Sequence, residues 1–345
     1  MNGIKLRSAD VCRHDVVTLG EVMLRLDPGE GRVRSTRSFT VSEGGGEYNV
    51  GRALRRCFEH RVAHVTAIGR NDVGRLLEDL MLQGGVNLDH IVWKDADEIG
   101  RWGRNPLNFT ERGFGMRSAR STYDRAHSAT GALNPSDIDW DHLFGEVGAR
   151  WLHTGGIFAG LSPATFETAQ VAMAAARRHG TVVSYDINYR PSLWAASGGA
   201  QAAERLTAEL LDHVDVLFGV DDSKLETVAT QLADKHPGLT MVAAPKRTVH
   251  SASQNDWSGR AWSRADGLID GLRLDALDIL DRVGGGDGFA SGVIHGLLTD
   301  HPLNAALNLG IAHGALVMTT PGDTSMADLG EVHHLAAGGD AGVIR

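Results

Sequence analysis

The chain contains little lysine, little cysteine and no long apolar run, and each shortage excludes a class of protein. None of its five lysines follows a glycine, so the sequence has no Gly-Lys-Ser/Thr phosphate loop. Its two cysteines, Cys12 and Cys57, supply neither a disulfide framework nor a four-ligand zinc set. No apolar run reaches the ~20 residues that span a bilayer, and the N-terminus lacks the apolar stretch of a signal peptide. We therefore expect a cytoplasmic protein.

The chain also has fewer basic than acidic residues, 34 Lys and Arg against 43 Asp and Glu. The formal net charge of −9 and the pI near 5.9 argue against a broad nucleic-acid surface, which needs clustered positive charge. The dinucleotide fingerprint occurs only as Gly284-x-Gly286-x-x-Phe289, which fails at its last position. We expect small-molecule ligands, with neither a nucleic acid nor a membrane as partner.

Short β-rich runs alternate with helical patterns along most of the 345 residues. This rhythm predicts an α/β fold with a mostly parallel central sheet flanked by helices. Predicted strands cover 16–19, 62–68, 88–93, 150–154, 182–185, 214–218 and 239–243. Predicted helices cover 48–58, 73–83, a segment opened by Ser162 and Pro163, 200–213, 288–298 and 303–318. The last dozen residues, rich in Ala and Gly, are expected to be loosely held.

Two polar segments, 23–41 and 99–125, interrupt the rhythm and are compatible with β structure. We interpret them as a lid that leaves the edge of the sheet. The second segment is rich in arginine, a residue whose planar fork suits a carboxylate ligand. A solvated, arginine-rich pair of surface strands is an equally good interpretation. The six arginines are Arg101, Arg104, Arg112, Arg117, Arg120 and Arg125.

The most informative stretch is 281–289, where three glycines lead into an apolar, helix-like segment with Asp287 at the junction. Residues without Cβ let several backbone N–H groups turn toward one point. A helix N-terminus adds unpaired N–H groups and its positive dipole end, so the stretch suits a phosphate. The alternative is that Gly284, Gly285 and Gly286 form only a tight turn and Asp287 only caps the helix.

The same run resembles the C-terminal signature of the ribokinase or PfkB family of carbohydrate kinases, Asp-Thr-x-Gly-Ala-Gly-Asp. In that family the pattern forms an anion hole, and its last Asp is the catalytic base. Asp287 falls on the base and Asp281 on the first Asp. Arg282 replaces the usual Thr and Gly285 the usual Ala.

The resemblance extends over nearly the whole chain and implies a ribokinase-like α/β domain at 15–330, with a tail at 331–345. Gly44, Gly45 and Gly46, followed by Asn49, resemble the glycine pair and the downstream Asn that approach the sugar hydroxyls in the family. By itself this short motif more often forms an ordinary turn before a helix.

Within the family, the closest likeness is to the 2-keto-3-deoxygluconate kinases. The segment Asp186 to Trp194 resembles their Asp-x-Asn-x-Arg-x-x-Leu-Trp pattern, which implies that Arg190 contacts a carboxylate or phosphate. The alternative for Arg190 is a salt bridge that fixes the loop. Tyr123 and Arg125 match lid residues that would contact the sugar acid, although Asp124 replaces a family aromatic.

The nucleotide and metal positions follow from the resemblance alone. It implies that 243–248 and 314–324 flank the adenine, with contacts from Lys246, Arg247, Gly284, Gly286 and Gly314. The Asn-x-x-Glu element that helps to place Mg²⁺ in many members is absent. Asp221 or Asp222 would hold metal-bound water instead, or else cap the following helix.

The resemblance thus implies ATP-dependent phosphorylation of a primary hydroxyl on a small sugar acid, with Mg²⁺ and with Asp287 as base. We expect the helix N-terminus to lower the pKa of Asp287. The alternatives are a kinase for a neutral sugar such as fructose or ribose, and a non-catalytic sugar-binding regulator. An exposed β lid would pair across a two-fold axis, which predicts a homodimer.

Overall fold

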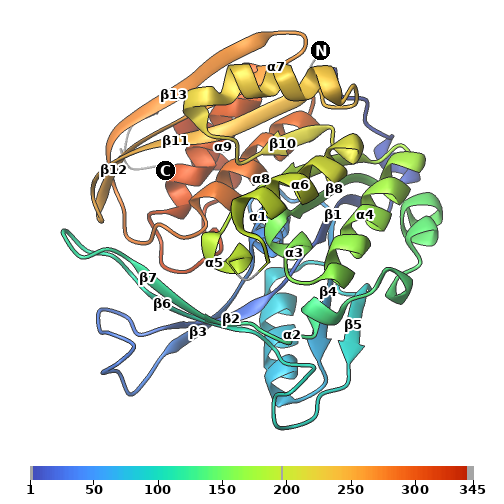
Figure 1. The fold of residues 1–345 in the computed structure, drawn as a ribbon. Coiled ribbons are helices and arrows are strands. Elements are labelled where there is room, and N and C mark those ends of the chain that lie inside the picture. The colour runs from blue at the N-terminus through green and yellow to red at the C-terminus, as the bar shows by residue number, and fades with distance from the viewer. Residues whose placement is uncertain (1–2, 196, 340–345) are drawn as a thin grey trace.

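The computed structural model describes residues 3–195 and 197–339, and its centre is a nine-stranded sheet with helices on both faces (Figure 1). The strands lie in the order β13-β12-β11-β10-β9-β8-β1-β4-β5. Neighbours from β11 to β5 are parallel, and β12 and β13 extend this sheet as antiparallel strands. Their bounds are β1 (His14–Leu19), β4 (Val62–Gly69), β5 (Ile91–Lys94), β8 (Ala149–Gly155), β9 (Val182–Asp186), β10 (Val216–Phe218), β11 (Met241–Ser251), β12 (Gln254–Ser263) and β13 (Gly267–Asp278).

Consecutive residues of the central strands pack into two different apolar cores, one on each face of the sheet. Val16 and Val182 belong to the first core, and the next residues, Val17 and Val183, belong to the second. In Figure 1, α4 and α6 lie in front of the sheet and α8 and α9 behind it. The predicted α/β fold with a mostly parallel sheet is confirmed.

The six predicted helices are all present, whereas the helices Gly156–Ala159, Pro191–Trp194, Leu225–Lys235 and Leu329–Ala336 were not predicted. The helix predicted to open at Ser162 is capped as expected, because the Ser162 hydroxyl accepts a hydrogen bond from the Thr165 backbone N–H at 3.1 Å. Their bounds are α1 (Gly46–Arg56), α2 (Asp72–Gly84), α3 (Gly156–Ala159), α4 (Pro163–Arg178), α5 (Pro191–Trp194), α6 (Gly199–Leu210), α7 (Leu225–Lys235), α8 (Gly285–Leu298), α9 (Leu303–Val317) and α10 (Leu329–Ala336). Within the described part of the chain, each helix is too short or too polar to cross a lipid bilayer.

The structure differs from the sequence patterns at the sheet edge and near the C-terminus. The patterns predict no strand over 254–278, yet β12 and β13 form a long antiparallel ribbon with β11. Much of β13 is exposed, so its side chains do not alternate cleanly between apolar and polar. The predicted tail at 331–345 begins inside α10, and its residues 340–345 lie outside the described residues.

A second, four-stranded sheet arises from the two polar segments and lies against one end of the main sheet (Figure 1). Its order is β3-β2-β6-β7, from β2 (Met23–Asp27), β3 (Thr40–Gly44), β6 (Leu107–Glu111) and β7 (Arg120–Asp124). We call it the small sheet. Its β6–β7 hairpin reaches the β11–β12 hairpin, where the Ala252 N–H donates to the Gly115 carbonyl at 2.8 Å. The Gly115 N–H in turn donates to the Ser253 hydroxyl at 2.8 Å.

Candidate active site

Three glycines lead into α8, and the structure gives each a different role. Gly284 adopts the left-handed conformation, with φ of 83°, and a Cβ there would collide with the Asp323 carbonyl oxygen. A Cβ on Gly285 would press on Met318, whereas one on Gly286 would meet no atom within 4 Å. The first turn of α8 therefore borders open space, with unpaired backbone N–H groups and the positive end of the helix dipole. This arrangement fits a phosphate group.

Asp287 lies in that first turn and is held by a residue 238 positions away. The Asn49 side chain, from α1, donates from Nδ2 to Asp287 Oδ2 at 2.7 Å. Asn49 Oδ1 accepts the Gly45 N–H at 3.3 Å, so one amide joins the two glycine motifs. Asn49 thus orients Asp287, a contact that the sequence resemblance did not imply.

The electrostatic surroundings of Asp287 reverse the expectation that the helix N-terminus lowers its pKa. Burial against protein raises the pKa of Asp287 well above its usual range, and the carboxylates of Asp186, Asp323 and Glu47 raise it further. The hydrogen bond from Asn49 opposes this shift. The desolvation of a carboxylate among three others outweighs the helix dipole, whose effect on a charge in the first turn is modest.

A cavity of about 650 Å³ contains this first turn of α8. Its walls come from the β3–α1 junction, the small sheet, the loop after β9 and the loop before α8. These elements meet at the carboxyl ends of the parallel strands, where open α/β sheets bind ligands. The cavity brings together ten of the predicted site residues: Gly45, Asn49, Tyr123, Arg125, Arg190, Arg247, Gly284, Gly285, Gly286 and Asp287.

Two predicted glycines lie behind the cavity wall. A Cβ at Gly44 would collide with the Asp323 side chain, so this glycine allows close packing. Gly314 is buried in α9, and a Cβ there would lie 2.7 Å from the Gly285 carbonyl oxygen. Gly314 therefore lets α9 approach the start of α8 and does not border the cavity.

The predicted metal and lysine contacts also lie off the cavity. Asp221 Oδ1 accepts hydrogen bonds from the Ser223 N–H at 3.0 Å and from the Ser223 hydroxyl at 2.7 Å. Asp221 therefore caps the following helix, which is the alternative to a metal contact. Asp222 pairs with Lys246 at 3.8 Å. Among residues 3–195 and 197–339, no cluster of three His, Cys, Asp or Glu side chains is arranged to hold a metal ion.

Arg125 is not a free cation. Its Nε donates to Glu21 Oε2 at 2.9 Å, and Nη2 contacts the same oxygen. The Ser128 hydroxyl donates to the other Glu21 oxygen at 2.9 Å. The guanidinium also lies 5.2 Å from the centre of the Tyr123 ring. Since Glu21 is buried and already neutralises this charge, Arg125 has limited capacity for a substrate carboxylate.

Three other arginines border the cavity without a carboxylate partner among the described residues: Arg190, Arg247 and Arg282. Arg190 donates to the neighbouring Tyr189 carbonyl at 3.2 Å, and its positive charge lowers the pKa of Asp186 against the effect of burial. Burial lowers the pKa of Arg247, and the positive charge of Arg282 lowers it further. Two cations held side by side without a counter-ion form a ready site for a polyanion.

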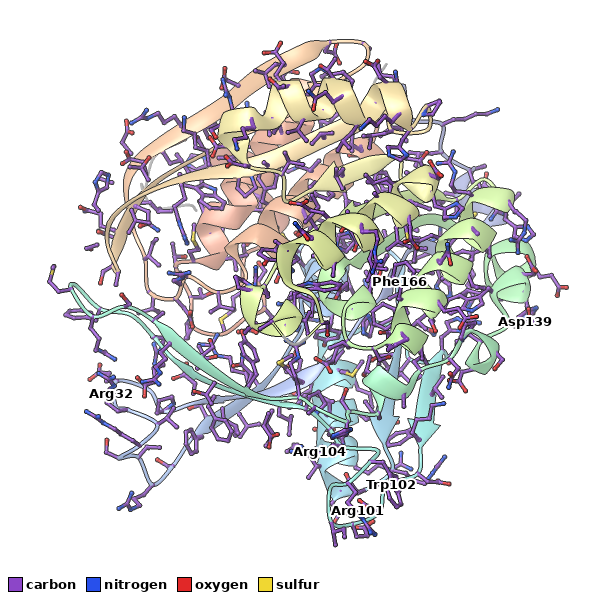
Figure 2. The ribbon with its side chains drawn as sticks, in the orientation of Figure 1. Arg32, Arg101, Trp102, Arg104, Asp139 and Phe166 are labelled. Carbon is purple, nitrogen blue, oxygen red and sulfur yellow. The ribbon has the colours of Figure 1, made fainter. Side chains whose placement is uncertain are left out.

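The remaining arginines of 99–125 fit the alternative of a solvated surface. Figure 2 shows Arg101 in the β5–β6 loop near the lower ends of α2 and β5, and Arg104 just above it, away from the tip of the β6–β7 hairpin. Arg101 pairs with Asp97 at 2.8 Å and Arg104 with Asp124 at 2.5 Å. Of the six, only Arg125 lines the cavity.

Four carboxyl groups in the cavity wall received no role in the sequence analysis: Glu21, Glu47, Asp186 and Asp323. Glu47, in the first turn of α1, is 3% exposed, and burial raises its pKa to about 7, with Asp186 and Glu21 contributing. Asp186 ends β9 and has a pKa raised by burial. A signal was present, because Glu47 stands inside the Gly44-to-Asn49 motif and Asp186 opens the segment that contains Arg190.

Residues 13–329 match the sequence profile of the pfkB family carbohydrate kinases. The chain belongs to this family. It is 28% identical over 341 residues to the 2-dehydro-3-deoxygalactonokinase of Haloferax volcanii, which covers 96% of this chain and 99% of that relative. The solved 2-dehydro-3-deoxygluconokinase of Thermotoga maritima has a TM-score of 0.84 at 29% identity, over 93% of this chain and 99% of that one. A Xylella fastidiosa fructokinase with bound ATP shares the fold, with a TM-score of 0.73 at 21% identity over 94% and 99%.

The family membership makes this pfkB protein a carbohydrate kinase with a ribokinase-like fold, as the signature at 281–287 predicted. The likeness to keto-deoxy sugar-acid kinases is also confirmed, since relatives with those names match almost the whole chain.

Proposed function

We propose that this carbohydrate kinase transfers the γ-phosphoryl group of ATP to a primary hydroxyl of a 2-keto-3-deoxy sugar acid, with 2-keto-3-deoxygluconate as the first candidate. The observation that carries the proposal is Asp287, oriented by Asn49 at the N-terminus of α8 and open to the cavity. A proton acceptor and a set of backbone donors then stand at one point, as phosphoryl transfer to an alcohol requires.

In the proposed reaction the substrate hydroxyl loses its proton to Asp287. Its oxygen forms a bond to the γ-phosphorus while the bond to the departing ADP oxygen breaks. Backbone N–H groups at 284–287 stabilise the charge on the transferred group, supported by Arg247 and Arg282. The raised pKa of Asp287 makes it a stronger proton acceptor once it is ionised.

Arg190 supports a sugar acid as the substrate. It borders the cavity and has no ion-pair partner among the described residues, so it is available for a carboxylate. Tyr123, on β7, also lines the cavity and is 46% exposed, which leaves it open to contact the sugar. Relatives named for keto-deoxy sugar acids favour the same substrate class.

The proposed phosphoryl donor is ATP carried as its magnesium complex. The open space at Gly286 and the free Arg247–Arg282 pair fit its phosphates. Asp221 and Asp222 do not fit as direct metal ligands, because their side chains are engaged away from the cavity. Mg²⁺ therefore enters only as the ion of the nucleotide, and the reaction assigns no step to it.

We also propose a homodimer formed through the small sheet. β7 is an edge strand whose five residues are all exposed, so its backbone is available to a second copy. Light scattering after size exclusion would give twice the 36.9 kDa mass of the chain.

A coupled assay of ADP release tests the function directly. Four substrates at equal concentration are compared: 2-keto-3-deoxygluconate, its galactonate epimer, fructose and ribose. Preference for a keto-deoxy acid supports the proposal, and preference for a neutral sugar contradicts the role of Arg190 while keeping that of Asp287. No turnover with any of them contradicts the proposal and favours a non-catalytic sugar-binding protein.

A further inference from the structure

Arg25 has a fully buried side chain, although it lies on β2 of the small sheet. It is surrounded by three carboxylates. Nη1 donates to Asp323 Oδ1 at 2.5 Å, and Nη2 donates to Asp27 Oδ2 at 3.0 Å and also to Asp281. Asp27 belongs to the small sheet, whereas Asp281 and Asp323 come from segments 256 and 298 residues away in the chain. One guanidinium thus joins three distant parts of the chain.

Asp281 and Asp323 both support the loop that opens α8. Asp281 accepts the Val283 N–H at 3.2 Å and the Gly322 N–H at 3.3 Å. The Asp323 carbonyl packs so tightly against Gly284 that a Cβ there would collide with it. The guanidinium therefore holds together the segment before α8 and the segment after α9, and the anion-binding glycines lie between these two anchors.

The charge balance shows why a cation is needed there. Asp281 is 2% and Asp323 6% exposed, so solvation by water does little to stabilise the negative charge of either carboxylate. Without Arg25 their mutual repulsion would drive the two segments apart, because like charges in a buried site interact strongly. Arginine suits this position better than lysine, since its planar fork fixes the direction of two partners at once.

We infer that Arg25 is a positioning residue for phosphoryl transfer, which acts through Asp281 and Asp323 to set the anion-binding glycines. The inference rests on the proposed kinase function and adds a residue of the small sheet to its machinery. Because Arg25 sits on β2, the position of the small sheet is mechanically coupled to the geometry of the phosphate site.

A pair of matched variants tests this. Asp281→Asn and Asp27→Asn each remove one buried carboxylate from the same guanidinium, and each carboxylate also accepts a backbone N–H, from Val283 and from Gly29. Asp27 also pairs with Arg112 at 3.3 Å, so its replacement removes more charge pairing than that of Asp281 and makes the control a stringent one. Only Asp281 connects to the glycine loop. We expect Asp281→Asn to lower kcat on the order of 10²-fold with little change in KM for the sugar, because a small misplacement of catalytic groups has that effect. Asp27→Asn should leave kcat nearly unchanged, although both variants lower Tm.

Equal losses of kcat in the two variants, in proportion to Tm, would overturn the inference and leave Arg25 a purely structural ion pair. Arg25→Ala provides a second test, in which added guanidinium ion should restore part of kcat without altering KM for ATP. A folded Arg25→Ala protein with wild-type kcat would also overturn the inference.

Hydrogen–deuterium exchange separates this inference from the proposed function. The amides of Val283 and Gly288 should exchange faster in Asp281→Asn and remain unchanged in Asp27→Asn, whether or not a substrate is turned over. Failure of the wild-type protein to release ADP would contradict the kinase proposal alone. Unchanged exchange in Asp281→Asn would contradict the role of Arg25 alone.

Discussion

Two groups of side chains around the cavity carry opposite charge and are stabilised in opposite ways. Arg247 and Arg282, which we call the phosphate end, have no acidic partner among the described residues. Glu47, Asp186 and Asp287 form the acidic group, and burial raises the pKa of all three. Asp287 lies in the first turn of α8, so the acidic group reaches the same helix N-terminus that would bind the phosphate. A phosphate needs the first environment and an alcohol proton needs the second.

The two groups also differ in their surroundings. Arg247 lies on β11 and Arg282 in the loop before α8, and the two cations repel one another in the absence of an anion. Among the carboxyl groups, Glu47 packs against Gly20 and Gly155 so closely that neither position has room for a Cβ. Each group therefore holds unfavourable charge, which a substrate of complementary charge or a transferred proton would relieve.

The largest expected effect comes from removing the base. Asp287→Asn should lower kcat by a factor on the order of 10² to 10⁴, because no side chain then accepts the hydroxyl proton. The amide oxygen can still accept the hydrogen bond from Asn49, so the geometry is preserved. Tm at pH 8 should rise, since a charge disfavoured by burial is removed. Steady-state kinetics and calorimetry check both, and a near-normal kcat would refute the assignment.

Glu47→Gln should stabilise the protein in a pH-dependent manner. Burial raises the pKa of Glu47 from 4.5 to about 7. A raised pKa means that wild-type stability is fully retained below pH 4.5 and lost as the pH rises through 7. A shift of this size corresponds to about 3 kcal/mol above pH 7.

Urea unfolding at pH 4.5 and pH 8 measures this difference. The exposed Glu204→Gln on α6 is the control and should change stability at neither pH. If Glu47→Gln and the wild type are equally stable at pH 8, the ionised Glu47 carboxylate is not destabilised by burial, and the raised pKa is contradicted.

Arg282→Ala should weaken the phosphate end by removing one of its two cations. We expect KM for ATP to rise by roughly 10- to 100-fold, the range for losing a hydrogen bond to a charged group. Arg273→Ala, an exposed arginine on β13, should leave it unchanged. Should both variants bind ATP as the wild type does, Arg282 has no part in the phosphate site.

Arg190→Ala should give the smallest effect. KM for the keto-deoxy acid should rise by about tenfold, as expected for one exposed charge-assisted contact, while KM for ATP stays constant. The unchanged KM for ATP is an internal control. A loss of ATP affinity instead would move Arg190 from the sugar side to the phosphate side.

Short motifs allowed much of the site to be predicted from the sequence. The glycines at 284–286 and Asp287 lie where their motif predicts, because a turn and a helix start are determined by neighbouring residues. The sequence predicted Asn49 as a site residue but did not predict its hydrogen bond to Asp287, since a contact across 238 residues depends on how two helices pack.

The unpredicted features depend on tertiary packing. Nothing in the local pattern around Arg25 indicates that a charged residue in a strand is buried among Asp27, Asp281 and Asp323. The pKa of Asp287 was predicted in the wrong direction, because the helix dipole is visible in the sequence and the neighbouring carboxylates are not. Gly314 proved to be a helix-packing residue for the same reason.

The pH dependence of kcat/KM tests the central claim, that a buried carboxylate in the cavity accepts the proton. Asp287 must be ionised to act, and its pKa in the unliganded protein is raised, so kcat/KM for the sugar should fall tenfold per pH unit as the pH decreases through a value well above the usual carboxylate range. The pH profile of the residual activity of Asp287→Asn should show no such fall. A wild-type kcat/KM that stays constant down to the ordinary pKa of an aspartate would contradict the account.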